Sequence, residues 1–79
     1  MYQYYVVEIL KNQSGAFEHN VFWLYDADDN KARLKGESKY HDIMSKAAVS
    51  EHKEHSAILF NSKAEPLLFG CYEHSEETA

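Results

Sequence analysis

Four segments rich in aromatic and β-branched residues alternate along the chain with short polar connections. They cover residues 2–10, 17–25, 56–61 and 67–72. Each has the composition of a β-strand. The connection between the first two contains Gly15 and the one between the last two ends at Pro66, as is typical of turns. The pattern therefore predicts two antiparallel hairpins, one in each half of the chain.

A different periodicity fills the interval between the hairpins. The acidic run that starts at Asp26 suits the free N–H groups and positive dipole of a helix start, so a helix is predicted over residues 28–49. Its small and apolar residues recur every three or four positions, in a stripe of Ala32, Gly36, Tyr40, Ile43 and Ala47. A glycine in this stripe indicates that the helix backbone lies close to a bulky strand side chain, with a tolerated imperfection as the alternative.

These patterns together predict an α+β protein with the order ββαββ. It has one four-stranded, mainly antiparallel sheet, and one amphipathic helix packs on one face of that sheet. Residues 1–74 form a single domain, and residues 75–79 form a polar tail that is expected to fray. The order of the strands stays open, because a helical crossover after the second strand allows more than one arrangement.

All four predicted strands carry more apolar residues than one helix can cover. A sheet covered on a single face should alternate apolar and polar residues, yet each strand contains an unbroken apolar run, for example residues 21–25. Self-association through the second face is the simplest explanation, and we therefore predict a homodimer. A twisted sheet that curls over its own side chains, or a ligand groove lined by aromatic residues, explains the same excess.

Composition and charge narrow the possible partners and the compartment. The 79-residue chain has 13 acidic and 8 basic residues and a net charge of −5, which disfavours direct binding to nucleic acids or anionic lipids. Its one cysteine, Cys71, excludes a scaffold of intramolecular disulfides and fits a reducing cytoplasm. The pattern contains neither a signal peptide nor a membrane span, so a cytoplasmic protein without membrane association is predicted.

No residue pattern in the sequence is typical of a catalytic or metal site. His52 and His55 are three positions apart, a spacing that shares a metal ion only within a helical turn. A thiol nucleophile at Cys71 needs a nearby imidazole, for which His55 and His74 are the candidates, and a buried structural cysteine is the alternative. We therefore predict no enzymatic activity, no metal and no cofactor.

Two groups of residues are candidates for binding. The first is mainly aromatic and consists of Tyr4, Trp23, Tyr25, Leu34, Tyr40, His41 and Tyr72. The second is an acidic patch of Asp26, Asp28 and Asp29, which suits a basic partner, with a solvated surface as the alternative. Lys31, Arg33 and Lys35 would hold the phosphate of a nucleotide-like ligand stacked on the aromatic residues, although ordinary solvated charge also explains them.

The stretch from Tyr25 to His41, YDADDNKARLKGESKYH, resembles a segment of a family of small uncharacterised bacterial and prophage-associated proteins. Residues 4–9 (YYVVEI) and 55–60 (HSAILF) extend the similarity. The resemblance implies no particular activity, but the prophage association implies stoichiometric binding to a host defence or nucleic-acid-processing protein. The predicted function is a small acidic, non-catalytic interaction protein. The alternative is a module that binds or sequesters a nucleotide-like ligand.

Overall fold

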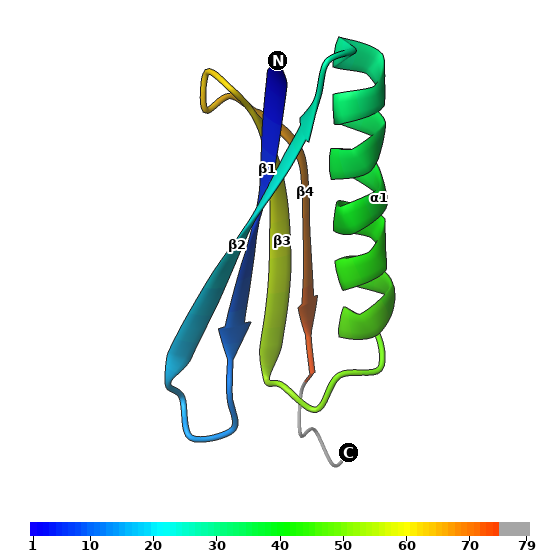
Figure 1. Cartoon of the computed structure of the whole chain (residues 1–79). Helices are drawn as coiled ribbons and strands as arrows, with labels where there is room; N and C mark the ends of the chain where they lie inside the picture. The colour runs from blue at the N-terminus through cyan, green and yellow to red at the C-terminus, as the bar shows by residue number, and fades with distance from the viewer. Residues whose placement is uncertain (75–79) are drawn as a thin grey trace.

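The computed structural model describes residues 1–74 of the chain. The expected fraying of residues 75–79 lies outside the described residues. The elements, shown in Figure 1, follow in the order β1 (Tyr2–Lys11), β2 (Phe17–Asp26), α1 (Asp29–Ala47), β3 (Glu54–Asn61) and β4 (Pro66–Glu73). The ββαββ order predicted from the sequence is confirmed. In this part of the chain, no helix is long and apolar enough to cross a membrane.

The four strands form one open sheet in the order β2-β1-β3-β4. All three pairings are antiparallel, and β1 lies in the centre, paired with β2 on one side and β3 on the other. In Figure 1, α1 runs alongside one face of the sheet, and β2 crosses at an angle to the other strands. The helix thus connects the edge strand β2 to the central strand β3, and β2 and β4 form the two edges.

Local hydrogen bonds fix where the helix begins and ends. The Asp28 carboxylate caps it by accepting from the N–H groups of Asn30 and Lys31 at 2.8 and 3.2 Å. The helix begins at Asp29 rather than Asp28 because Asp28 is extended, with φ −107° and ψ 125°. It ends at Ala47, two residues before the predicted end, because beyond the C-cap residue Ala48 the N–H groups of Val49 and Ser50 bond to carbonyl oxygens only three residues back.

The strand β3 begins at Glu54, two residues earlier than its composition predicts. The sequence around Glu54 and His55 is polar, yet these residues pair with Lys11 and Leu10 of β1. Pairing with a long central strand therefore extends β3 into a segment whose composition alone indicates a linker.

The core lies between α1 and the sheet, and the predicted helix stripe from Ala32 to Ala47 is the buried set. Opposite the helix, Val6 and Leu59 are fully buried. A Cβ atom on Gly36 would lie 2.7 Å from Leu59 Cδ1, so this glycine allows the helix backbone to approach the sheet. The expected proximity of Gly36 to a bulky strand side chain is confirmed.

A polar pair lies within the covered face of the sheet. His55 Nε2 is 2.6 Å from Glu8 Oε2, and Asn20 donates to the other carboxylate oxygen of Glu8 at 3.1 Å. The His55 side chain is 6% exposed and that of Glu8 is 15% exposed. His55 Nε2 thus faces the Glu8 carboxylate, while His55 Nδ1 has no hydrogen-bond partner among the described residues.

Acid is expected to destabilise the start of the helix through Asp26. Its carboxylate accepts from the Asp28 N–H at 2.9 Å and lies 3.1 Å from Lys35 Nζ, and these interactions hold the pKa of Asp26 below its ordinary value of 3.8. A carboxyl whose pKa is lowered by folding contributes stability above its unfolded pKa and loses it as the pH falls through the folded pKa. When the pH is lowered below about 4, we therefore expect the unfolding free energy of Asp26→Asn to fall less than that of the wild type.

Urea unfolding at several pH values measures this difference. The two proteins should have unfolding free energies that converge as the pH falls. Parallel curves over the same range would exclude a contribution from this carboxylate.

Candidate functional site

The face of the sheet opposite α1 has no covering element among the described residues. Since successive strand residues point to opposite faces, the register assigns alternate residues of each strand to this side. We name this surface the open face. Its apolar residues are Tyr5, Val7, Ile9, Phe17, Val21, Trp23, Tyr25, Ile58, Phe60 and Phe69.

Three aromatic rings form a row across the open face. Tyr5 lies directly opposite Trp23 on one neighbouring strand and Phe60 on the other. The ring centroids are 4.8 Å apart for Tyr5 and Trp23 and 4.9 Å apart for Tyr5 and Phe60. Such contacts hold the rings in place, so the row is a rigid apolar strip on the surface.

The open face presents several well-exposed apolar side chains on one continuous surface. Phe69 is 67% exposed and Trp23 is 50% exposed. With strands ~4.8 Å apart and ~3.3 Å per residue, four strands of this length present a face of about 500 Å². Patches beyond a few hundred Å² commonly mark interaction surfaces. The excess of apolar strand residues seen in the sequence therefore lies on this uncovered face.

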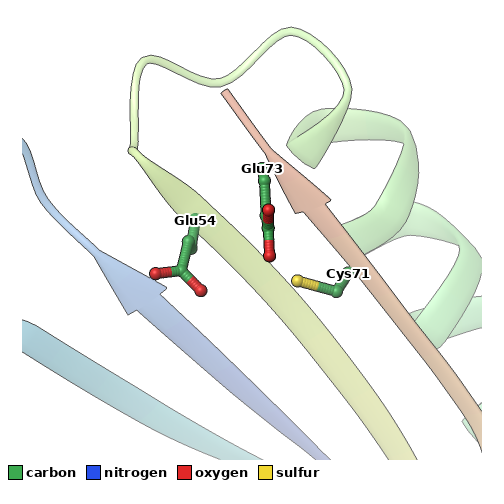
Figure 2. Close-up of side chains that lie close together, drawn as sticks. All are labelled: Glu54, Cys71 and Glu73. Atoms are coloured by element: carbon green, nitrogen blue, oxygen red, sulfur yellow. The ribbon is translucent and has the colours of Figure 1, made fainter. Parts of the chain in front are cut away.

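One end of the open face is polar and mainly acidic. Glu54 lies opposite Glu73 on β4 and 3.3 Å from Lys11 Nζ on β1. Figure 2 shows the Cys71 sulfur next to the two carboxylates, and one ligand atom from each of these three side chains lies within 4.8 Å of the others. A thiolate and two carboxylates are ligands that Zn²⁺ accepts, but structural zinc sites have four protein ligands, and Lys11 already pairs with Glu54. We therefore treat these residues as the acidic border of the open face.

The aromatic residues of the predicted binding set lie on two faces of the sheet. Trp23 and Tyr25 are exposed on the open face. Tyr4 and Tyr40 are each 8% exposed and belong to the core under the helix, and Tyr72 lies on that same side. The structure does not bring these rings together around one groove.

Tyr4 instead has a structural role at the start of the helix. Its hydroxyl donates to Asp29 Oδ1 at 2.7 Å. This hydrogen bond, together with burial, raises the pKa of Tyr4 above its ordinary value of 10.0. The bond links β1 to the first turn of α1.

The other predicted binding residues lie near or on the helix. Leu34 and His41 are exposed on α1, away from the open face. The three residues of the predicted acidic patch each make a local bond, because Asp28 caps the helix, Asp26 pairs with Lys35 and Asp29 accepts from Tyr4.

Two of the three candidate phosphate-binding cations, Arg33 and Lys35, have partners in the chain. Arg33 Nε is 3.0 Å from Glu37, one turn further along the helix. Lys35 Nζ is 2.9 Å from the Tyr25 carbonyl oxygen as well as 3.1 Å from Asp26. These contacts direct the two side chains towards neighbouring residues of the same chain.

The sheet separates Cys71 from the imidazole of His55. Cys71 lies opposite Ser56, whereas His55 lies opposite Tyr72, so the two side chains are on opposite faces. His74 Nε2 is 2.8 Å from the Ala47 carbonyl oxygen, and His52 Nδ1 is 2.7 Å from Ser50 Oγ. His52 and His74 thus make hydrogen bonds within the chain, and the imidazole of His55 lies across the sheet from Cys71.

The sequence analysis missed two central residues of the open face, Tyr5 and Phe60. Both lie within unbroken apolar runs, which hide the alternation that separates one face of a strand from the other. Trp23 was the one residue of the row that the sequence singled out. Tyr5 and Phe60 are recognised as its neighbours only once the strand pairing is known.

Comparisons with protein-family models, with curated proteins and with solved structures found no match to this chain.

Proposed function

We propose that the protein is a non-catalytic interaction protein that binds another protein through its open face. One observation carries this proposal: the rings of Trp23, Tyr5 and Phe60 contact one another in a row on an uncovered apolar surface, with Trp23 exposed and the other two half-buried. Aromatic residues held rigidly at the centre of a surface are the usual anchors of protein interfaces, because they bury much area at little entropic cost.

The charges around the open face define the chemistry of the partner. Its apolar centre is bordered at one end by Glu54 and Glu73, and the net charge of the chain is −5. A complementary surface has an apolar patch bordered by lysine or arginine residues, since complementary potentials favour association and like charges oppose it. Lys11 is the one lysine or arginine that the register of the described strands places on this face, which gives a nucleic acid little to bind.

Nucleic-acid-processing proteins, including those of host defence, commonly carry basic surfaces of this kind. The resemblance to prophage-associated proteins supports the same class of partner, on the basis of analogy. We propose stoichiometric occlusion of such a basic surface as the mode of action.

Photo-crosslinking from two matched positions tests the proposal. Benzoylphenylalanine replaces either Phe69 on the open face or Leu34 on the outer side of α1, which are 67% and 61% exposed. We expect the probe at position 69, and not the probe at position 34, to crosslink to one discrete protein. An excess of unlabelled wild type should suppress this crosslinked product. The crosslinked residue should lie in an apolar patch bordered by basic residues. Capture of the same protein from position 34, an acidic crosslinked surface, or no product from position 69 would each contradict the proposal.

A further inference from the structure

The two edges of the sheet differ in how well they are protected against pairing with another strand. At the β4 edge, the strand begins with Pro66, contains Gly70, and has a register irregularity opposite Leu59 and Phe60. Each of these features limits the addition of a further strand. The strand β2 has ten residues, FEHNVFWLYD, without proline, glycine or lysine, and pairs with β1 in unbroken register.

From this difference we propose that two copies of the chain pair through the outer edges of their β2 strands, antiparallel about a two-fold axis at Val21. The two four-stranded sheets then form one continuous sheet, with both open faces on the same side. This proposal concerns the edge and does not depend on what the open face binds.

The register of the pairing follows from the sequence of β2. Directly opposed residues of two antiparallel strands point to the same face of the sheet. In a pair of identical strands, one residue must therefore lie opposite its own copy, and the two-fold axis passes between these two copies. An axis at Phe22 places Glu18 opposite the partner's Asp26, a like-charge pair that occurs twice. An axis at Asn20 places the last residues of β2 opposite the hairpin turn. An axis at Val21 pairs the strand along its length and avoids both problems.

Charge complementarity supports the same register. With the axis at Val21, Leu24 lies opposite the partner's Glu18. Leu24 lines a shallow groove between β2 and α1 together with Lys35, Lys39 and Asp42. Lys35 pairs with Asp26 and Asp42 pairs with Lys46, whereas Lys39 Nζ lies 4.0 Å from the centre of the Phe22 ring. The pairing therefore brings the Glu18 carboxylate to a groove in which Lys39 makes no ion pair with another described residue.

Sedimentation analysis of the full chain over a range of concentrations tests the pairing. We expect the wild type to show a reversible monomer–dimer equilibrium. Val21→Lys places two like charges at the axis and should weaken the dimer at least about tenfold. Phe69→Lys, on the open face near the other edge, should leave the dimer unchanged. A strictly monomeric wild type, or a dimer lost in Phe69→Lys and kept in Val21→Lys, would overturn the proposal.

A charge exchange tests the register itself. Glu18→Lys should weaken the dimer, and the double variant Glu18→Lys/Lys39→Glu should restore it, because each copy then presents the opposite charge to its partner. Both residues lie outside the core, so circular dichroism should show an unchanged fold. Additive weakening in the double variant would contradict the register.

Crosslinking provides an independent geometric readout of the axis. In a Cys71→Ser background, Val21→Cys should form an intermolecular disulfide on oxidation, since opposed Cα atoms are ~5.5 Å apart. Trp23→Cys should not, because its two copies would be ~13 Å apart along the strands. The reverse result would place the axis elsewhere. A Phe69→Lys variant that keeps both the dimer and full partner binding would count against the open-face proposal alone.

Discussion

Replacing His55 with leucine is expected to lower the free energy of unfolding by about 3 kcal/mol, because the substitution leaves the Glu8 carboxylate without its principal partner on the covered face. The carboxylate is 2.6 Å from His55 Nε2 and only 15% exposed, and Asn20 alone remains to donate to it. A buried charge that loses its partner costs more than the net stability of the intact pair.

The double variant Glu8→Leu/His55→Leu distinguishes this explanation from a simple loss of packing. Since it removes both polar groups and keeps apolar volume, it should be more stable than His55→Leu alone. Glu51→Leu is the exposed control and should change stability by less than about 0.5 kcal/mol. Urea unfolding at neutral pH measures all three. A double variant that is less stable than His55→Leu would contradict this role for the pair.

The second large effect is expected at the contact between Gly36 and Leu59. Leu59 is fully buried, so Leu59→Ala should lower the free energy of unfolding by about 3 kcal/mol through the lost burial and the cavity it leaves. Gly36→Ala alone should also destabilise the protein, because its methyl group would lie 2.7 Å from Leu59 Cδ1. This clash opposes the gain of about 1 kcal/mol that alanine normally brings to a helix interior.

Combining the two substitutions should reverse the sign of the Gly36 effect. In the Leu59→Ala background the added methyl group has space, and we expect Gly36→Ala to raise stability by about 1 kcal/mol. A double-mutant cycle measured by urea unfolding gives the coupling directly. If Gly36→Ala had the same effect in both backgrounds, the close approach of helix and sheet would not depend on this contact.

The sequence predicted the helix well because its signals are local. The stripe containing Ala32, Tyr40 and Ile43 has a helical period, and the acidic residues before it cap the N-terminus. The same stripe led to the correct expectation for Gly36. By contrast, the close approach at Gly70, where a Cβ atom would lie 2.5 Å from Tyr40 Oη, depends on strand register, and register is not a local property.

The candidate site was only partly predictable for the same reason. Unbroken apolar runs showed that the sheet has an apolar excess, and two residues of the predicted binding set, Trp23 and Tyr25, are exposed on the open face. Those runs could not show which residues face the helix. Tyr4 was therefore grouped with Trp23, although the pleat places it in the core and its neighbour Tyr5 in the aromatic row.

Acidic residues that contribute the same charge have different structural roles in this chain. Asp28 and Glu73 contribute equally to the net charge, but Asp28 caps a helix while Glu73 borders the open face. Glu8, in the middle of a strand, turns inward to His55. Contacts between residues far apart in the chain decide among these roles, so a count of acidic residues predicts the overall charge and not the location of a patch.

The central claim is that the open face, and not the helical side, is the binding surface. The most direct test is the affinity of Phe69→Lys and Leu34→Lys for the protein captured from position 69, measured by isothermal titration calorimetry. Both positions are similarly exposed, at 67% and 61%, so both variants should fold like the wild type. We expect Phe69→Lys to weaken binding at least about tenfold, because an ammonium group would be buried in an apolar interface, and Leu34→Lys to leave it within about twofold. Unchanged affinity for Phe69→Lys, or a larger loss for Leu34→Lys, would contradict the claim.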